Sequence, residues 1–484
     1  MGTLAQMPWP ADLDIQGLTA DSRAVRPGWL FAALPGTRPG PGPGSGVDGR
    51  RFIADAVARG AVAVLAPEGT AWPEGVPPRP LLLEREPRRA LALLAAAHAG
   101  PQPALCVAVT GTNGKTSTAD FLRQLLALAG RRAASVGTLG IVTERGAEAG
   151  GMTTPDPVAL AAALARLARD GVDAVAMEAS SHGLDQFRLD GVRLAAAGLS
   201  NLTRDHLDYH GTMDAYRAAK LRLFSDLLPP GAPAVADAGL DAQTGDALRG
   251  IAARRGLRLR TTGEGGDLYR LVRAAPRPEG QELEIEAGGV RHLVPLALPG
   301  RFQADNALLA AGLAEAVGVA APLALLPRLL GVRGRLELAA RLPNGAAAYV
   351  DYAHTPDALA RLIQALRPHA AGRLHLVLGA GGDRDAGKRP LMGEAARAAD
   401  VAWVTDDNPR GEDPAAIRRA ILAALPGARE VGDRARCIAE ALDALAPGDV
   451  LAVAGKGHES GQTVAGVTLP FDDAAVIRGL AGRA

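Results

Sequence analysis

The stretch that most constrains the fold is residues 107–119, VAVTGTNGKTSTA. An apolar run over residues 104–109 predicts a short buried strand that breaks at a glycine-rich loop. Leu122 and Leu125 then fall on one face of a helix that Gly130 is placed to end. Strand, glycine-rich loop and helix in this order form a phosphate cradle, because backbone N–H groups and the helix N-terminus face the anion. The alternative is an ordinary glycine-rich turn.

The loop residues have the chemistry that a nucleotide phosphate requires. A lysine reaches the outer phosphates, and the hydroxyl beside it holds Mg²⁺. The generic pattern has a glycine at position 109, where this chain has valine, so the cradle is a shortened one. The candidate nucleotide-binding residues are Gly111, Thr112, Asn113, Gly114, Lys115, Thr116 and Ser117.

Composition narrows the class of protein. A chain of 484 residues suggests about three domains. The net charge of +1 and the aromatic content of 3% do not favour a nucleic-acid partner. Two cysteines give neither a disulfide framework nor a metal knuckle, which fits a reducing cytosol. Without a leader or a long apolar span, we expect a soluble cytoplasmic protein, not inserted in a membrane and monomeric.

Lysine is rare in this chain. Of 53 basic residues only Lys115, Lys220, Lys388 and Lys456 are lysines, and the rest are arginines. A lysine kept against this bias marks a place where a compact, titratable amine serves and a guanidinium does not. Each of the four lies in a distinctive stretch, although for any single lysine chance alone is a sufficient explanation.

Two further stretches of the middle region carry candidate chemistry. An apolar run over residues 172–177 predicts a strand that ends at Glu178, where a nucleotide-hydrolysing fold places an acid directed at the metal. Residues 200–211, SNLTRDHLDYHG, hold two histidines and two aspartates, among them His206. The alternatives are an ordinary loop carboxylate and a solvated polar turn.

Residues 213–224 are predicted to form a helix. Met213, Tyr216, Lys220 and Phe224 are three or four residues apart, so they share one face. Lys220 therefore lies on the apolar stripe of this helix. The alternative to a functional role is a lysine that buries its stem and keeps its ammonium group in water.

The remaining sequence predicts α/β structure at both ends. Residues 52–60 are expected to form a helix and residues 61–66 a strand, whereas the proline- and glycine-rich residues 37–46 favour a surface loop. Alternating runs at residues 282–286 and 292–298 predict antiparallel strands.

The C-terminal region alternates strands and helices, which predicts a parallel sheet with a ligand site beyond the strand C-termini. Its expected strands are residues 347–350, 374–378, 401–405 and 450–454, and each is followed by a polar stretch. No internal repeat is evident.

Together these stretches resemble the Mur ligase family of ATP-dependent amide-bond ligases, over nearly the whole chain. The most specific motifs are residues 177–183 and 204–211, DYAHTPD at 351–357, GGDRDAGKRP at 381–390, DDNPR at 406–410 and GKGHE at 455–459. The resemblance implies an α/β fold of three domains. They are a small N-terminal UDP-binding domain (residues 1–100), a central P-loop-type ATP-binding ligase domain (101–333) and a C-terminal Rossmann-like domain for the incoming amino acid (334–484).

The resemblance also implies a reaction. ATP with Mg²⁺ phosphorylates a carboxylate of UDP-N-acetylmuramoyl-L-alanyl-D-glutamate, and the amine of meso-2,6-diaminopimelate displaces the phosphate. The physical logic stands alone, because a carboxylate is a poor electrophile with a poor leaving group, and phosphorylation remedies both. L-Lysine as the added amino acid and a folylpolyglutamate synthase-like ligase are the alternatives.

Site residues follow from the same resemblance. The catalytic set is Lys115, Glu178, His206 and Lys220, and the metal set is Thr116, Glu178, His206 and Lys220 as a carbamylated lysine. Asn306, Asp351 and His354 complete the ATP site. Ser22, Thr153, Thr154, Ser180, Gln186 and Arg188 match contacts to the UDP-muramoyl peptide. Arg384, Asp407, Asn408, Pro409, Arg410, Gly455 and Glu459 match the diaminopimelate pocket.

The chain departs from the family pattern at two places. Residues 37–46 replace a polar stretch that usually approaches the uracil, and Gln303 stands where the family often has asparagine. A P-loop switch protein is the competing class. The chain has no Asn-Lys dipeptide for a guanine-binding motif, and a switch would hydrolyse nucleotide without a small substrate.

Overall fold

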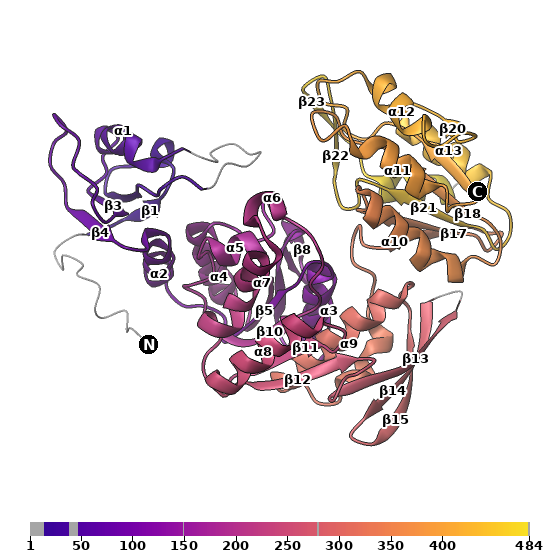
Figure 1. Cartoon of the computed structure of the whole chain (residues 1–484), viewed down its shortest axis with the longest axis horizontal. Helices are drawn as coiled ribbons and strands as arrows, with labels where there is room; N and C mark the ends of the chain where they lie inside the picture. The colour runs from indigo at the N-terminus through magenta and orange to yellow at the C-terminus, as the bar shows by residue number, and fades with distance from the viewer. Residues whose placement is uncertain (1–13, 38–46, 149, 278–279, 483–484) are drawn as a thin grey trace. The chain divides into compact units, whose positions relative to one another are not determined.

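The computed structural model describes residues 14–37, 47–148, 150–277 and 280–482 (Figure 1). The chain divides into two compact units, one of residues 1–268 with Leu309–Ala320 and one of Tyr269–Leu308 with Ala321–Ala484. Most of the stretch 37–46 lies outside the described residues.

The first unit begins with a small α/β segment. Its strands β1 (Gly17–Thr19), β2 (Trp29–Ala32), β3 (Ala63–Pro67) and β4 (Leu81–Glu84) form a parallel sheet in that order. Helices α1 (Ile53–Ala58) and α2 (Pro87–Ala99) accompany them. The helix and strand expected at residues 52–60 and 61–66 are confirmed as α1 and β3.

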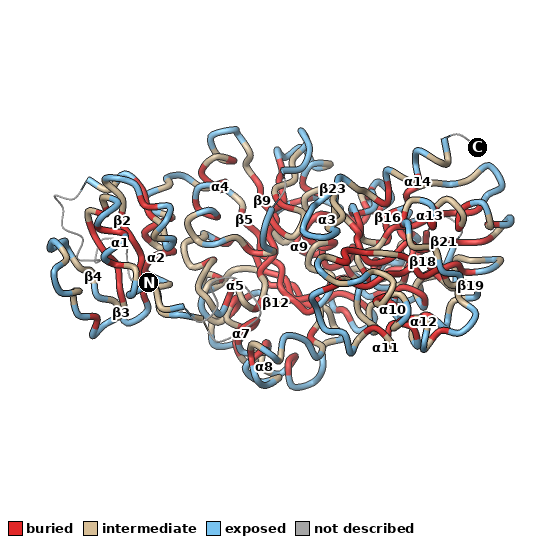
Figure 2. Tube along the Cα trace, turned by 90° about the horizontal axis from the view of Figure 1, so that it is seen from above, coloured by how far each residue is buried: buried red, intermediate tan, exposed pale blue. Residues whose placement is uncertain are grey.

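The rest of the first unit is built around a larger sheet, whose order here is β12-β11-β10-β5-β9-β6-β7-β8. The strands are β5 (Leu105–Thr110), β6 (Ala133–Gly137), β7 (Gly140–Thr143), β8 (Gly146–Glu148), β9 (Ala174–Glu178), β10 (Leu194–Leu199), β11 (Pro233–Asp237) and β12 (Arg258–Gly263). Strand β5 pairs in parallel with β9 and β10. It is buried along almost its whole length (Figure 2), as expected for a central parallel strand covered on both faces.

The helices that follow in the first unit are α3 (Lys115–Leu128), α4 (Pro157–Arg169), α5 (Ser181–Asp185), α6 (Leu207–His210), α7 (Met213–Arg222) and α8 (Ala242–Arg255). Side-chain caps mark the start of four of them, α4, α5, α7 and α8. The Asp156 carboxylate accepts from the N–H groups of Val158 and Ala159, and the Thr212 hydroxyl accepts from the N–H of Ala215. The α-helix predicted over residues 213–224 ends earlier, at Arg222, and a π-helical turn over Leu223–Leu227 continues it.

The second unit contains a six-stranded sheet in the order β16-β17-β21-β18-β19-β20. Its strands are β16 (Glu337–Arg341), β17 (Ala347–Asp351), β18 (Leu374–Leu378), β19 (Val401–Val404), β20 (Arg429–Glu430) and β21 (Val450–Ala454). Only β16 runs antiparallel to its neighbour, so the parallel sheet expected for residues 347–454 is confirmed.

Alternation along these strands sends side chains to two separate cores. Leu374, Leu376 and Leu378 pack with α10 (Pro356–Leu366), α11 (Lys388–Ala396) and α12 (Pro414–Leu422). Val377 packs on the other face with α13 (Arg434–Asp443) and α14 (Asp473–Ala481). Because successive strand residues face opposite ways, one apolar run fills both cores and leaves the strand ends for polar loops.

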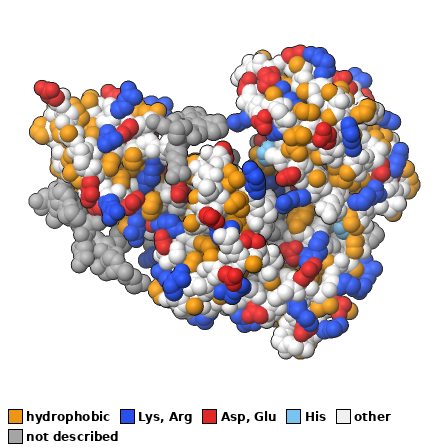
Figure 3. Space-filling model, viewed as in Figure 1, with side chains coloured by type: hydrophobic (Ala, Val, Ile, Leu, Met, Phe, Trp, Pro, Cys, Tyr) orange, Lys and Arg blue, Asp and Glu red, His pale blue; other side chains and the backbone are white. Residues whose placement is uncertain are grey.

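Three antiparallel strands, β13 (Tyr269–Arg277), β14 (Gly280–Ala287) and β15 (Val290–Leu296), also belong to the second unit. Strands β14 and β15 confirm the antiparallel strands expected at residues 282–286 and 292–298. Helix α9 (Arg301–Ala316) has residues in both units. A separate hairpin of β22 (Gly461–Val464) and β23 (Val467–Pro470) follows β21. On the face in Figure 3, basic and acidic side chains are interspersed.

We predict that the ion pair of Arg434 with Asp473 strongly stabilises the second unit. Both side chains are fully buried, and two hydrogen bonds of 2.7 Å join them. Asp473→Asn leaves a buried guanidinium without its counter-charge, which should cost about 3–5 kcal/mol of the free energy of unfolding. Urea unfolding measures this loss.

Arg436→Ala is the matched control for this measurement. Arg436 lies on the same helix α13, and its pair with Glu440 is largely exposed. Loss of an exposed pair should change the unfolding free energy by less than about 1 kcal/mol. Equal losses in the two variants would contradict the prediction.

Candidate functional site

The loop between β5 and α3 has a backbone that only glycine permits. Gly111 has φ +146 and Gly114 has φ +84. A Cβ atom on Gly111 would lie 2.0 Å from the Ser200 hydroxyl oxygen. This close approach ties the loop to residues 200–203. There Thr112 N donates to Asn201 O at 2.9 Å, and the Ser200 hydroxyl donates to Asn113 O at 2.6 Å.

Lys115 folds over this loop. Its ammonium group donates to the carbonyl oxygens of Gly111 and Thr112, both at 2.9 Å. The first N–H groups of α3 follow directly, so cationic and N–H donors gather at one end of the helix. Such an end attracts anions.

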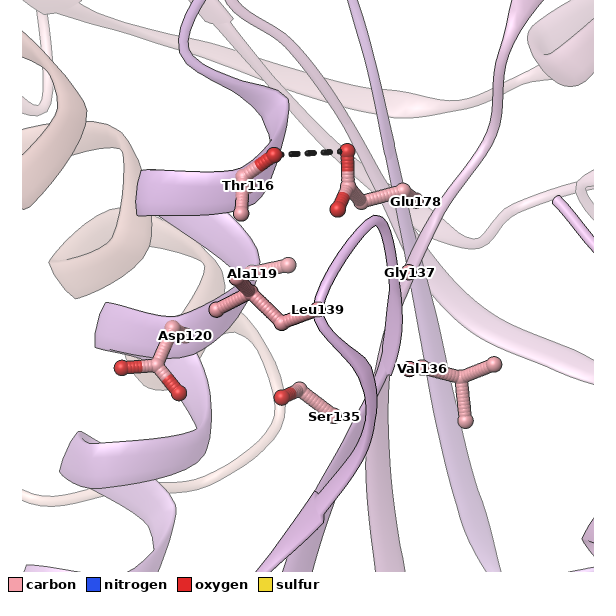
Figure 4. Close-up of a pocket in the computed structure, with 9 residues that line it drawn as sticks. Thr116, Ala119, Asp120, Ser135, Val136, Gly137, Leu139 and Glu178 are labelled. Atoms are coloured by element: carbon pink, nitrogen blue, oxygen red, sulfur yellow. Dashed lines mark hydrogen bonds between the residues drawn. The ribbon is translucent and has the colours of Figure 1, made fainter. Parts of the chain in front are cut away.

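Glu178 lies at the end of β9, beside the start of α3. Its side chain is buried and accepts hydrogen bonds from the Thr116 hydroxyl at 3.0 Å and from Thr138 N at 2.7 Å. Figure 4 shows Thr116 and Glu178 facing one another above a small cavity. Gly137 is required here, because a Cβ atom would lie 2.1 Å from a Glu178 carboxylate oxygen.

Lys220 is buried, with 2% of its surface exposed. Its ammonium group donates to Gly111 O at 2.7 Å and lies 4.5 Å from the centre of the Tyr216 ring. The interpretation of a lysine with its ammonium in water is therefore wrong for Lys220. Burial, and then the charge of Lys115, lower the pKa of Lys220 to about 6.

Residues 205–210 place several aromatic rings near Lys220. His206 has φ +52, and its ring lies 4.9 Å from that of His182 and 6.2 Å from that of Tyr216. Burial lowers the pKa of His206, the Asp205 carboxylate opposes this, and the charges of Lys115 and Lys220 reinforce it. A neutral imidazole is the form that ligates metals.

The four predicted metal ligands thus fall into two groups. Thr116 and Glu178 are hydrogen-bonded to each other. His206 and Lys220 form the other group, and the charge of Lys115 lowers the pKa of both. Within the described residues, no cluster of three or more His, Cys, Asp or Glu side chains is placed to hold a metal ion.

Five of the six residues predicted to bind the UDP-muramoyl peptide form one network. The Thr154 hydroxyl donates to Glu178 O at 2.9 Å and accepts from Ser180 N at 3.0 Å. Arg188 donates to Thr154 O and to Gln186 Oε1, both at 2.7 Å. The Thr153 hydroxyl reaches the Thr138 hydroxyl at 3.1 Å. Ser22 lies elsewhere in the chain, in the turn Ser22–Ala24, and its part in this site stays a prediction.

In the second unit, the residues predicted to contact the nucleotide form hydrogen bonds with other residues of the protein. Asn306 donates to Gln303 at 3.2 Å, and Gln303, fully buried, donates to Arg335 O at 3.3 Å. Asp351 accepts from the N–H groups of Leu336 and Ala353, both at 2.8 Å. His354 follows at the end of β17, its Nδ1 2.8 Å from Tyr352 O. Whether these residues contact a nucleotide stays a prediction.

The ends of β19 and β21 bring most of the predicted amino-acid pocket together. Asn408 donates to the Glu459 carboxylate at 2.9 Å. Gly455 has φ +114, and a Cβ atom there would lie 2.5 Å from an Asp407 carboxylate oxygen. The buried Pro409 separates Asn408 from Arg410. Parallel strands have gathered these side chains at one edge of the sheet.

Arg410 is held by its backbone. Its φ of +52 is unusual for a non-glycine residue, and its N–H donates to Thr463 O in β22 at 3.0 Å. The guanidinium donates to Gly382 O at 2.7 Å. This bond brings Arg410 to the loop that carries Arg384, which is exposed.

Sequence reasoning missed two residues of these sites. Thr138 bonds both Glu178 and Thr153, and Lys456 bonds both Asn408 and Glu459. For Thr138, the signal was a polar residue directly after the strand β6, which pairs with β9. For Lys456, it was the scarcity of lysine, which singled the residue out without giving it a partner.

We predict that Lys220→Met raises stability most at low pH. The folded state holds the amine with a pKa of about 6, against an ordinary 10.5, so between these values the unfolded chain binds more protons. The destabilisation caused by Lys220 is therefore greatest at and below pH 6 and shrinks as pH rises. Urea unfolding of both proteins in CO₂-free buffer at pH 6 to 9 measures the difference. A difference independent of pH would contradict the prediction.

Comparison with known proteins agrees with this architecture. Three protein-family models match: "Mur ligase family, catalytic domain" at residues 14–98, "Mur ligase middle domain" at 109–314 and "Mur ligase, glutamate ligase domain" at 334–457. Within the described residues, no helix is long and apolar enough to cross a bilayer.

Individual relatives match along almost their whole length. The chain is 54% identical to UDP-N-acetylmuramoyl-L-alanyl-D-glutamate–2,6-diaminopimelate ligase of Caulobacter vibrioides, covering 98% of this chain and 97% of the relative. The enzyme of the same name from Agrobacterium fabrum is 51% identical, over 96% and 93% of the two chains.

Solved structures give the same result. A structure of a ligase of that name, 33% identical, has a TM-score of 0.69 and covers 97% of this chain and 95% of its own. The MurF ligase of Thermotoga maritima with ADP shares the fold, with a TM-score of 0.62 over 98% of each chain at 20% identity. The predicted three-domain α/β architecture is thereby confirmed. The chain belongs to the Mur ligase family.

Proposed function

We propose that this protein is an ATP-dependent ligase that adds meso-2,6-diaminopimelate to UDP-N-acetylmuramoyl-L-alanyl-D-glutamate. Its relatives are named as ligases of that acceptor and 2,6-diaminopimelate. The observation that carries the proposal is identity of 54% and 51% to two such ligases over almost the whole chain. Cytoplasmic location and a monomeric state remain expectations from the sequence.

The phosphate loop suits ATP and Mg²⁺. Gly111 and Gly114 have no side chain to keep a phosphate away from the backbone, and Lys115 supplies a positive charge. The Thr116 hydroxyl and the Glu178 carboxylate, 3.0 Å apart, are the hard oxygen donors that Mg²⁺ prefers. When bound, ATP supplies the phosphoryl group that activates a carboxylate, and Mg²⁺ neutralises phosphate charge. Lys115 would hold the outer phosphates in line with the acceptor.

Lys220 has a chemistry that arginine lacks. With a pKa of about 6 it is a neutral amine at pH 7, able to add CO₂ and release one proton, which gives an N-carboxylate anion. That anion would attract the Lys115 ammonium group, whose charge disfavours a protonated Lys220. Together with the neutral imidazole of His206, it would offer donors for a second metal ion.

The network around Thr154 suits the acceptor substrate. Arg188 presents a guanidinium whose orientation is fixed by Thr154 O and Gln186. Ser180 caps the N-terminus of α5, two residues after Glu178. A fixed cation and several hydroxyl groups would orient the acceptor peptide so that its terminal carboxylate meets the outer phosphate.

The cluster at the ends of β19 and β21 suits a zwitterionic amino acid. Arg410 offers a fork for a carboxylate, and Glu459 offers a charge for an ammonium group. Meso-diaminopimelate carries one more carboxylate than L-lysine, remote from the attacking amine. A site with a positive charge that binds this remote carboxylate prefers meso-diaminopimelate. A site without such a charge would favour the alternative substrate, L-lysine.

The test is ADP release by the full-length protein with ATP, Mg²⁺ and the UDP-muramoyl dipeptide. Meso-diaminopimelate, L-lysine and L-ornithine are each added in turn. We expect release only when acceptor and amino acid are both present, fastest with meso-diaminopimelate. Lys115→Ala should abolish it, because the outer phosphates lose their lysine. ADP release that needs no acceptor would favour a nucleotide switch and contradict the proposal.

We predict that Arg410→Ala lowers kcat/KM for meso-diaminopimelate by roughly two to three orders of magnitude. Loss of a charge-assisted partner costs a few kcal/mol, which corresponds to that factor. The weak use of L-lysine, which lacks the remote carboxylate, should fall far less. Equal decreases of kcat/KM for both amino acids would mean that Arg410 supports its loop and does not bind the remote carboxylate.

A further inference from the structure

Lys456 is a fully buried lysine that the proposed reaction leaves without a role. It follows β21 in the stretch GKGHE, and none of its surface is exposed. Its ammonium group lies 3.2 Å from Asn408 Oδ1 and 3.2 Å from Glu459 Oε2. Lysine is almost never fully buried unless it is paired, and here both partners belong to the amino-acid pocket.

The bond from Lys456 is one of three that orient the Asn408 amide. Asn408 Oδ1 accepts from Lys456 Nζ and also from Thr463 N at 2.9 Å. Both partners are donors, so the amide oxygen has to face them. The NH₂ group then points to Glu459 Oε2, 2.9 Å away. Without Lys456, the amide oxygen would keep only the backbone donor of Thr463, and the NH₂ group would donate to a Glu459 carboxylate that has itself lost the Lys456 bond.

The same ammonium group positions the Glu459 carboxylate. Its Oε2 accepts from both Asn408 and Lys456, whereas its Oε1 accepts no hydrogen bond from the residues that the structure describes. The side chain is 35% exposed. One oxygen is therefore anchored inward, and the other is left for a donor that arrives from solvent.

We propose that Lys456 is a positioning residue for the incoming amino acid, which sets the Asn408 amide and the Glu459 carboxylate without touching the substrate. This inference rests on the proposed function. A compact ammonium group has only three N–H donors to satisfy in a closed space that offers two acceptors. A guanidinium has five N–H groups to satisfy there. This explains a lysine in a chain that otherwise uses arginine.

Lys456→Met tests the inference in the full-length protein. Methionine has similar length, suits a buried site and removes the ammonium group. We expect KM for meso-diaminopimelate to rise about 10- to 100-fold, in line with the loss of hydrogen bonds from a charged donor. KM for ATP and for the UDP-muramoyl dipeptide should stay within about twofold, as no bond to their predicted residues is lost. Arg436→Met, an exposed change in the same unit, is the matched control.

A double-mutant cycle separates positioning from general support. If Lys456 acts through Glu459, then Lys456→Met should add less than about threefold to the KM of Glu459→Gln, since the carboxylate that it orients is already lost. If the KM increase of the double variant equals the product of the increases of the two single variants, the inference is overturned. An unchanged KM for meso-diaminopimelate in Lys456→Met, or equal rises of KM for all three substrates, would also overturn it.

Lys456→Gln, which keeps a polar donor, replaces the methionine variant if the latter does not fold. Failure of both variants to fold would show a structural role and overturn the inference. The wild-type assay distinguishes the two proposals. A wild-type protein that releases no ADP with meso-diaminopimelate overturns the proposed function and this inference with it, whereas an active wild type leaves Lys456 to be judged by its own variants.

Discussion

Two lysines converge on one carbonyl oxygen, that of Gly111. Lys115 reaches it at 2.9 Å from the helix that follows the loop, and Lys220 reaches it at 2.7 Å from α7. Burial disfavours the charged form of Lys220, and the nearby Lys115 ammonium group adds to this, so the pKa of Lys220 falls to about 6. The positive φ of Gly111 and its contact with Ser200 make this geometry possible, and the rest of the first unit holds it in place.

Parallel sheets explain why the two candidate sites lie where they do. In each unit the central strands are buried on both faces, and their carboxyl ends emerge together at one edge. Polar residues placed after successive strands therefore meet, although they are far apart in the chain. Glu178 with Thr138 in the first unit, and Asn408 with Glu459 in the second, arise in this way.

Two fully buried charges in the second unit, on Arg434 and Lys456, have specific partners. Arg434 pairs with Asp473 and also donates to Ala454 O at 2.9 Å, directly before the GKGHE stretch. Lys456 divides its donors between Asn408 and Glu459. Such groups are costly to leave unpaired, so they hold their loops in one arrangement. A pocket that must distinguish two similar amino acids benefits from this rigidity.

Local patterns in the sequence predict the glycine-rich loop between a strand and a helix, the alternation of strands and helices, and the polar stretches at the strand ends. These follow from local periodicity and from the chemistry of neighbouring residues. Tertiary contacts, and not local patterns, show that Thr138 bonds Glu178, that the ammonium group of Lys220 is buried rather than in water, and that Lys456 contacts both Asn408 and Glu459. Those features depend on which strand ends become neighbours and on how deeply a helix face is covered. Distant segments decide both, and no local pattern in a single sequence records them.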